Sequence, residues 1–312
     1  MCIRDSCYNP RHSDRRRLTA AEWADVLDDL RALGTLTVTL TGGEALTHPE
    51  FFEIAAAVRA RSLAFKLYTN GSLITDDVAA RLAALRPLAV ELSLHGATAG
   101  VHDATTATPG SFMALRAGIE RLRAQGVRLL IKTPLTRLNE SQLDDLIALV
   151  AGWGLPHTID PTLTPNDNGD RGPLGFSPSP AAVERLMTAL QAVGRLPTAT
   201  REEGGTNCGL GRLTLAVDPE GDVFPCLQWR RRPLGNVRRQ RLRDLWPASE
   251  ERRHVAEIAQ RANDALVQRG GAAARFPFCP ALALEETGDA LEPGARFLAN
   301  AEIAERVRLS TS

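Results

Sequence analysis

The stretch Leu36-Thr37-Val38-Thr39-Leu40-Thr41-Gly42-Gly43-Glu44 decides the fold predicted for this chain. Residues 36–41 are mostly β-branched or apolar, which favours a strand, and Pro49 is then well placed as the first residue of a helix. In a parallel α/β protein, a turn between strand and helix lies where ligands bind. The two glycines let a ligand approach the backbone, and Glu44 offers a charge for an amine. An ordinary tight turn remains an alternative interpretation.

The order of strand and helix repeats through the first half of the chain. Strands are predicted at 36–41, 63–69, 88–94, 127–132 and about 157–162, with helices between them at 49–61, 76–85, 111–125 and 139–152. A capping box of Thr19 and Glu22 starts a further helix, which ends at Gly34. Starts recur every ~25–40 residues, the span of a βα unit, so we expect a parallel sheet with its helices outside.

Polar residues and glycines gather at one end of every predicted strand. These ends read Gly42-Gly43-Glu44, Thr69-Asn70-Gly71-Ser72, Ser93-Leu94-His95-Gly96, Lys132-Thr133 and Asp160-Pro161. The carboxyl ends of parallel strands converge on one mouth of a βα barrel, so we expect a single ligand site there. Loops of any protein are polar and rich in glycine, and that alternative stays open.

The periodicity changes past residue 163, and a turn-rich connection at 165–173 predicts a domain boundary between 1–164 and 165–312. Two short strands at 212–217 and 222–226 flank Asp218-Pro219-Glu220-Gly221, which is the turn chemistry of a β-hairpin. Helices are predicted near 178–193, 242–246 and 249–268, with Cys279 and Pro280 in a loop after them.

Composition excludes several classes of protein. Acidic and basic residues balance at 37 each, so no general attraction to nucleic acid or to an anionic membrane is expected. No apolar run approaches the ~20 residues of a membrane helix, and no signal peptide opens the chain. We therefore expect a cytoplasmic protein.

Five cysteines are spread along the chain, and an odd number without a secretion signal argues against a disulfide framework. Cys208, Cys226 and Cys279 fall beside turns and strand ends, not on the apolar faces of helices. Thiolates gathered from loops suit zinc or an iron–sulfur cluster, and spacing alone does not choose between them. Buried thiols that serve as small apolar fillers are the third possibility.

The order of these motifs resembles the radical S-adenosylmethionine (radical SAM) enzymes. The matching stretches are Cys7-Tyr8, Gly42-Gly43-Glu44, Tyr68-Thr69-Asn70-Gly71 and Ser93-Leu94-His95-Gly96. The later stretches Cys208, Gly221-Asp222-Val223-Phe224-Pro225-Cys226, Gly235-Asn236-Val237, Leu245-Trp246 and Phe278-Cys279-Pro280-Ala281 resemble the SPASM extension of that superfamily. The resemblance implies an α/β protein: a partial (β/α)6 TIM-like barrel lacking its first strand, followed by a small α+β SPASM-like domain with a β-hairpin.

The chemistry implied by the resemblance is an oxidoreductase reaction. A [4Fe–4S] cluster would cleave S-adenosylmethionine reductively to a 5′-deoxyadenosyl radical, which abstracts hydrogen from a C–H bond. The substrate would be a peptide, a protein or a small molecule, with peptide or protein modification favoured. An electron donor such as a flavodoxin or ferredoxin would reduce the cluster, and neither nucleic acid nor a membrane is an expected partner.

The resemblance also implies roles for residues at the strand ends. The backbone of Gly42 and Gly43 would receive the amine of the cofactor, with Glu44 as its charged partner. Asn70 and Ser93 are candidates for the ribose hydroxyls, because both are short polar side chains at neighbouring strand ends.

Other polar residues have weaker claims. Thr105 stands where some relatives carry a basic residue for the cofactor's carboxylate. His95, His102 and Lys132 could donate protons, although an isolated histidine is more often structural. No catalytic residue is assigned.

Two departures from the family pattern bear on activity. Cys7 would be a cluster ligand, but Arg4 stands where the middle ligand is expected and Cys2 is out of register. We therefore expect an N-terminally truncated chain that is inactive by itself, from a parent that is active. The SPASM extension in full form carries more cysteines than Cys208, Cys226 and Cys279, and these three predict one auxiliary [4Fe–4S] cluster. The alternative is a zinc-stabilised α/β binding or scaffold protein without radical chemistry.

Overall fold

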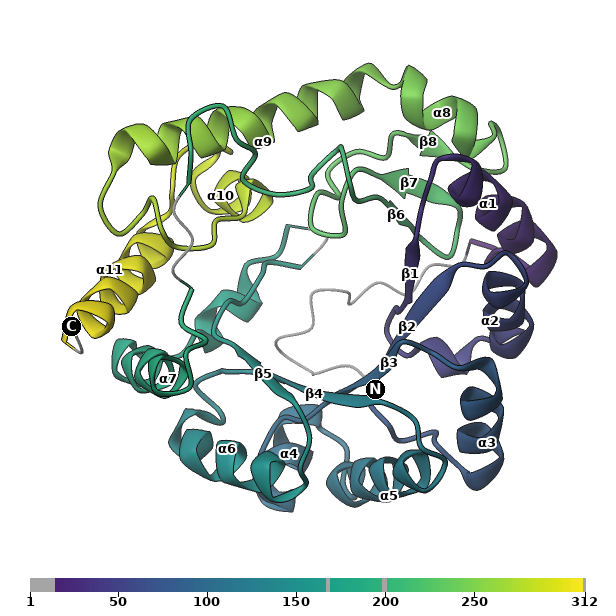
Figure 1. The fold of residues 1–312 in the computed structure, drawn as a ribbon, viewed down its shortest axis with the longest axis horizontal. Helices are drawn as coiled ribbons and strands as arrows, with labels where there is room; N and C mark the ends of the chain where they lie inside the picture. The colour runs from purple at the N-terminus through teal and green to yellow at the C-terminus, as the bar shows by residue number, and fades with distance from the viewer. Residues whose placement is uncertain (1–14, 167–168, 198–200, 311–312) are drawn as a thin grey trace. The chain divides into compact units, whose positions relative to one another are not determined.

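The computed structural model describes residues 15–166, 169–197 and 201–310. These residues form two compact units. The first holds the described residues up to Asn166 together with Gly172–Ser177 and Arg241–Arg243, and the second holds the rest. Figure 1 shows the elements of both.

The first unit is built on a five-stranded parallel sheet. Its strands are β1 (Thr37–Leu40), β2 (Ala64–Thr69), β3 (Ala89–Ser93), β4 (Leu129–Pro134) and β5 (His157–Asp160). They lie side by side in chain order, and each pairs in parallel with the next. This confirms the predicted parallel α/β architecture. The barrel strand expected before Cys7 lies outside the described residues.

Six α-helices accompany these strands: α1 (Ala20–Ala32), α2 (Phe51–Ala60), α3 (Asp76–Leu85), α4 (Ala99–Thr106), α5 (Ser111–Ala124) and α6 (Leu143–Gly152). The predicted capping box opens α1, because the Thr19 hydroxyl accepts from the Glu22 N–H and the Glu22 carboxylate accepts from the Thr19 N–H. The start expected at Pro49 is wrong. A 3-10 turn, η1 (Ala45–Thr47), occupies the chain directly after Glu44, and α2 begins at Phe51.

Alternating side chains of the sheet face opposite sides. Figure 1 shows α2 to α6 along the outer side of the strands. Phe65 and Leu67 of β2 are fully buried on that side. Lys66 and Tyr68, which alternate with them along the strand, point to the inner face. In the part of the first unit that the structure describes, no helix covers this inner face.

The second unit combines helices with a small antiparallel sheet. Its strands are β6 (Ala216–Val217), β7 (Asp222–Phe224) and β8 (Gly235–Asn236), in that order. The predicted hairpin between β6 and β7 is confirmed, with shorter strands than expected. Asp218 shapes its turn, because its carboxylate accepts from the N–H groups of Glu220 and Asp222. Gly221 takes the left-handed φ of +91° that closes the turn.

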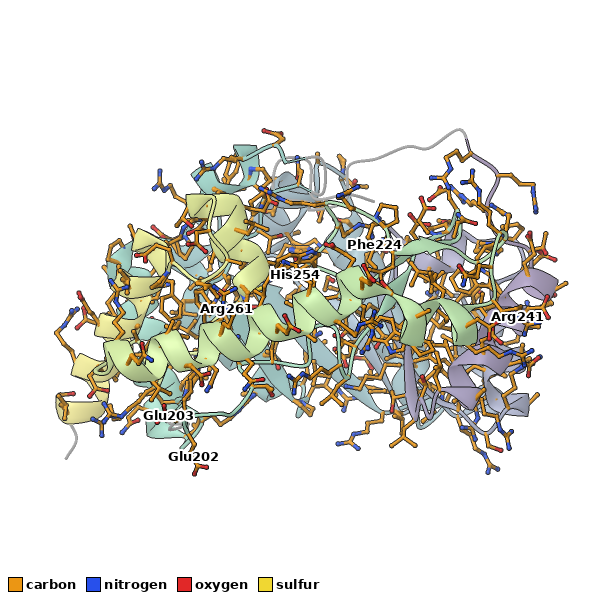
Figure 2. The ribbon with its side chains drawn as sticks, turned by 90° about the horizontal axis from the view of Figure 1, so that it is seen from above. Glu202, Glu203, Phe224, Arg241, His254 and Arg261 are labelled. Carbon is orange, nitrogen blue, oxygen red and sulfur yellow. The ribbon has the colours of Figure 1, made fainter. Side chains whose placement is uncertain are left out.

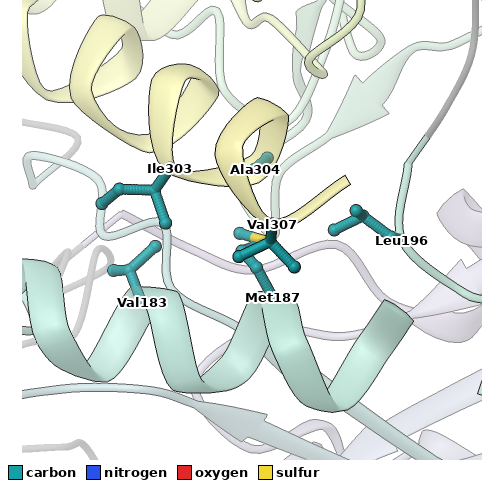
Figure 3. Close-up of a cluster of buried hydrophobic side chains, with 6 residues drawn as sticks. All are labelled: Val183, Met187, Leu196, Ile303, Ala304 and Val307. Atoms are coloured by element: carbon teal, nitrogen blue, oxygen red, sulfur yellow. The ribbon is translucent and has the colours of Figure 1, made fainter. Parts of the chain in front are cut away.

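The helices of this part are α7 (Pro180–Ala192), α8 (Leu242–Ala248), α9 (Glu250–Arg269), α10 (Pro280–Thr287) and α11 (Ala295–Ser310). A core cluster of Val183, Met187, Leu196, Ile303, Ala304 and Val307 joins α7 to α11 (Figure 3). His254 and Arg261 stand on the exposed side of α9 (Figure 2). Cys279 ends the expected loop as the N-cap of α10, whereas Pro280, expected in the same loop, opens this helix.

No helix among the residues that the structure describes has an apolar stretch long enough to cross a membrane.

Candidate functional site

Glu44 ties the ends of β1 and β2 together. Its carboxylate is buried, with 8% of the residue exposed. The Thr69 hydroxyl donates to both carboxylate oxygens (2.9 and 3.0 Å), and the Asn70 N–H donates to Oε2 at 2.8 Å. The Leu46 N–H donates to Oε1 at 3.1 Å and so caps η1. Three donors of its own chain use most of the acceptor capacity of this carboxylate, so Glu44 first of all positions the turn.

The two glycines before Glu44 leave the turn open. Gly42 has a φ of +147°, which L side chains rarely adopt, whereas Gly43 has no such restriction. Within the part of the chain that the structure describes, a Cβ built on either glycine would meet no heavy atom within 4 Å. This backbone fits a ligand that approaches the turn closely, as predicted for the amine end of S-adenosylmethionine.

Asn70 presents an unused donor beside this turn. Its Oδ1 accepts from the Ser72 N–H at 2.8 Å, which fixes the orientation of the amide. The other end, Nδ2, is buried and has no hydrogen-bond partner among the described residues. A buried N–H₂ group without a partner is costly, so a ligand oxygen such as a ribose hydroxyl fits this position. Ser93 lies at the end of β3, half-buried and in register with Lys132.

Thr105 suits its predicted role less well. It is buried in α4, and its hydroxyl donates to the Val101 carbonyl at 2.8 Å. The proton that a carboxylate ligand would need is therefore used within the helix. Its assignment to the carboxylate of the cofactor stays a prediction.

The two histidines near β3 form a buried pair. Nδ1 of His102 accepts from the His95 N–H at 3.1 Å, so the neutral ring of His102 carries its proton on Nε2. Burial lowers the pKa of His95 to about 3 and that of His102 to about 4. Both rings are therefore neutral near pH 7, which favours the structural interpretation. Nδ1 of His95 is buried and has no partner in the described chain.

A charged cluster occupies the inner face of β2, β3 and β4. The carboxylate of Glu91 lies 2.6 Å from Nζ of Lys132 and 3.2 Å from Nζ of Lys66. Nζ of Lys132 also sits over the Tyr68 ring, 3.8 Å from its centroid. Burial would raise the pKa of Glu91 and lower that of Lys132, but their hydrogen bond and charges outweigh burial, so the first is lowered and the second raised.

Sequence reasoning noticed Lys132 but missed Lys66 and Glu91. A signal was present in the composition, because Lys66 and Lys132 are the only lysines of the chain.

The predicted metal ligands fall in two places. Cys7 lies outside the described residues. Cys208 is exposed just before the hairpin, Cys226 follows β7, and Cys279 caps α10. Cys226 and Cys279 contact one apolar cluster, formed by Leu210, Trp229, Val255, Ala259, Ala281 and Ala290.

The three thiols of the second unit are electrostatic neighbours. The pKa of Cys279 is raised to about 11, chiefly by burial, with smaller contributions in the same direction from Cys226 and Cys208. Burial and Cys226 likewise raise the pKa of Cys208. No three His, Cys, Asp or Glu side chains of the described residues are grouped to hold one metal ion. The thiols of an iron–sulfur cluster bind separate iron atoms, whereas the ligands of a zinc ion converge on one point. The assignment of Cys208, Cys226 and Cys279 to one cluster stays a prediction.

Comparison with known families agrees with this geometry. Residues 6–150 match the sequence model of the radical SAM superfamily. Residues 208–269 match the model of SPASM, an iron–sulfur cluster-binding domain. The two matches include Cys7, the ends of β1 to β4, Cys208 and Cys226. Domains of these two kinds imply [4Fe–4S] clusters and S-adenosylmethionine.

Among curated proteins, the chain is 34% identical to the mycofactocin maturase MftC of Mycobacterium ulcerans over 227 residues. That alignment covers 68% of this chain and 61% of the maturase, so the chain spans about three fifths of this relative's length. It is 26% identical to the PqqA peptide cyclase of Ruegeria pomeroyi, over 92% of this chain and 82% of the cyclase. An AdoMet-dependent heme synthase of Methanosarcina barkeri is 28% identical over 75% of this chain and 74% of the synthase.

Solved structures share the fold at lower identity. The structure of anSMEcpe with bound AdoMet and Cp18Cys peptide has a TM-score of 0.76 and 16% identity, and covers 100% of this chain and 93% of that one. The structure of Streptococcus suis SuiB bound to precursor peptide SuiA has a TM-score of 0.61 and 14% identity, over 78% of this chain and 61% of that one.

Proposed function

We propose that this chain, which belongs to the radical SAM superfamily and carries a SPASM domain, binds S-adenosylmethionine beside the Gly42–Glu44 turn. We further propose that its substrate is a peptide, which it modifies. Bound next to a reduced [4Fe–4S] cluster, this cofactor supplies one-electron chemistry that removes hydrogen from an unactivated C–H bond. An electron donor such as a flavodoxin or ferredoxin would reduce the cluster. The division near residue 165 into a barrel and a SPASM part belongs to the same proposal.

Residues of the chain would hold the cofactor in three ways. The open backbone of Gly42 and Gly43 would receive its amine, and Glu44 would keep that backbone in place through Thr69 and Asn70. Nδ2 of Asn70 would donate to a ribose hydroxyl, with Ser93 as a second polar group at the neighbouring strand end. Cys7 is the proposed thiolate at the cofactor cluster.

Peptide modification is favoured by the names of similar proteins. Two of the relatives above are a peptide maturase and a peptide cyclase, and two structures of the same fold are described with bound peptides. A heme synthase among the relatives makes a small-molecule substrate the second candidate.

The observation that carries the proposal is the open Gly43 backbone beside a buried, fully engaged Glu44. It gives a direct test. A Gly43→Ala variant adds a methyl group that meets no atom of the described residues within 4 Å, so its melting temperature should stay unchanged. If a cofactor uses this turn, the methyl group should weaken S-adenosylmethionine binding about tenfold or more, measured by isothermal titration calorimetry under anaerobic conditions.

Gly152→Ala at the end of α6 is the matched control, because its Cβ also meets nothing and it lies at the amino end of β5. Equal affinity of the chain and both variants would contradict the proposed site. Turnover is measured separately as 5′-deoxyadenosine, because Arg4 stands at a ligand position of the cluster loop and we expect little product from this chain.

Metal analysis decides between this function and the zinc alternative. Brown protein with iron and sulfide supports the radical SAM proposal, whereas colourless protein with stoichiometric zinc supports a binding or scaffold protein.

A further inference from the structure

The use of lysine in this chain is unusually selective. Of the 37 basic residues only Lys66 and Lys132 are lysines, and the other 35 are arginines. The two lysines are 66 residues apart in numbering, yet both reach the carboxylate of Glu91. A chain that uses arginine everywhere else has thus placed its lysines at one point of the fold.

The sheet brings them together. Lys66 is on β2 and Lys132 on β4, and Glu91 stands on β3 between these strands. All three side chains point to the inner face, opposite the fully buried Phe65 and Leu67. The register pairs Tyr68 with Glu91 and Ser93 with Lys132. The cluster therefore lies directly below the strand ends at which the cofactor is proposed to bind.

The cluster carries an excess positive charge. One carboxylate neutralises one of the two ammonium groups, which leaves a net charge of about +1 on the inner face. The Glu91 side chain is only 3% exposed, whereas those of Lys66 and Lys132 are 41% and 38% exposed. The acid is thus enclosed and the two bases are accessible. A purely structural ion pair would need only one lysine.

The choice of lysine over arginine leaves donors available. A guanidinium would bind the Glu91 carboxylate through two parallel hydrogen bonds and use its planar fork on it. An ammonium group has three donors, and each lysine meets Glu91 through a single Nζ contact. The Tyr68 ring covers one side of the Lys132 ammonium. The Tyr68 side chain is also a hydrogen-bond partner of Lys132. Three donors on each ammonium exceed these contacts, which leaves a donor on each lysine for a ligand acceptor.

We propose that Lys66 and Lys132, held by Glu91, bind a carboxylate of the peptide substrate on the inner face of the sheet. The proposal rests on the function proposed above and names the chemistry of the substrate at that site. The carboxylate would belong to the C-terminus or to an acidic side chain of the peptide. It anchors the peptide below the cofactor, where the reacting C–H bond has to be placed.

The presence of only two lysines allows a direct measurement. We would label the full chain with ¹³C,¹⁵N-lysine, record its two Nζ signals by NMR, and assign them with Lys66→Arg and Lys132→Arg. The probes are N-acetyl-trialanine, its C-terminal amide, and N-acetyl-Ala-Glu-Ala amide. We expect one of the two carboxylate probes to shift both Nζ signals saturably, and the trialanine amide to shift neither. A response to N-acetyl-trialanine indicates that the site binds a C-terminus, and a response to N-acetyl-Ala-Glu-Ala amide indicates an acidic side chain.

Charge variants test the mechanism further. Lys132→Gln should weaken binding of the responding probe about tenfold, because one charge-assisted hydrogen bond is lost. Glu91→Gln should strengthen binding of the responding probe several-fold, because the Glu91 carboxylate no longer competes with the probe for the lysines. A merely structural Glu91 would instead give a variant with weaker or unchanged binding.

Three results would overturn the proposal: equal shifts with the amide and the acids, no shift with any peptide, or shifts caused only by S-adenosylhomocysteine. The last result would assign the lysines to the cofactor's carboxylate. None of these readouts needs an iron–sulfur cluster or turnover. Lysines that respond while Gly43→Ala leaves cofactor binding unchanged would support the carboxylate site and reject the proposed cofactor site.

Discussion

Single residues around β3 show how burial sets charge at the proposed site. His95 and His102 are both buried, and their rings lie 5.5 Å apart between centroids. Neither has a carboxylate partner close enough to hold a positive charge against this burial, and the nearby Asp103 only partly offsets it for His102. The pair is therefore kept neutral, while Glu91 and Lys132 a short way along the same sheet remain ionised.

This difference predicts how stability depends on pH. The pKa values of His95 and His102 are lowered to about 3 and about 4, from ~6.5 in an unfolded chain. At pH values between the pKa in the folded chain and the pKa in the unfolded chain, the unfolded chain binds more protons than the folded one. The contribution of the pair to stability is thus complete above pH ~6.5 and is lost as the pH falls towards 4. Urea unfolding at a series of pH values measures this decline.

A His102→Asn variant isolates the effect. The asparagine oxygen can accept from the His95 N–H in place of Nδ1, but it does not titrate. We expect the stability of this variant to fall less steeply between pH 6.5 and 4. Equal slopes for the variant and the unmodified chain would show that His102 is not kept neutral by the fold.

At this scale the sequence predicted where polar residues lie but not what they contact. Glu44, Asn70 and Ser93 were identified because strand ends of a parallel sheet are adjacent. The hydrogen bonds from Thr69 and Asn70 to Glu44 span 25 and 26 residues, so they exist only once the strands are paired. The same holds for the Glu91 cluster, whose members come from three strands.

α5 packs closely against the turn after β2. A Cβ on Gly118 of α5 would lie 2.6 Å from the Gly71 carbonyl oxygen and 3.2 Å from Cβ of Ile74. This approach brings the loop carrying Asn70 against the helix layer. The absent side chain of Gly118 thus links helix packing to the position of a proposed cofactor ligand.

Gly118→Ala should therefore destabilise the protein, although alanine is the better helix former. The helix gains ~1 kcal/mol from propensity, whereas overpacking typically costs ~1–3 kcal/mol and the contact is with backbone. We expect a net loss and a lower urea midpoint. Gly152→Ala in α6, where a Cβ meets nothing, should show no loss. A Gly118→Ala variant as stable as the unmodified chain would contradict the close approach.

Elements with a strong apolar period were predicted within a few residues, as for β2 and α3. Three helices were missed, α4, α10 (Pro280–Thr287) and α11, and two of them for identifiable reasons. α4 (Ala99–Thr106) buries the polar residues His102, Thr105 and Thr106, so it lacks the apolar stripe that marks a helix. α11 mixes arginine and glutamate with its apolar residues, and only its contact with α7 buries Ile303 and Val307.

For the whole molecule, alternation of strands and helices was enough to predict the parallel sheet of the first unit. In the second unit the hairpin and the helices α7, α8 and α9 were predicted, but the rest of its small sheet was not, because its strands are very short. Its three cysteines come from separate segments of sequence. Two of them, Cys226 and Cys279, meet only through tertiary packing against one apolar cluster.

That grouping leads to a prediction about the metal content of the chain. If Cys208, Cys226 and Cys279 hold one auxiliary cluster, anaerobically reconstituted protein should contain about four iron and four sulfide per chain. Cys279→Ala should remove most of this iron and the visible absorption, because the remaining two thiolates cannot retain the cluster. Alanine is a modest change at this half-buried position, so circular dichroism should show a folded chain.

Cys2→Ala is the matched control, because Cys2 is out of register with the family's ligands, and this variant should keep its iron. Unchanged iron in Cys279→Ala would mean that the metal is bound elsewhere, and Cys226 and Cys279 would then be apolar fillers of the second unit.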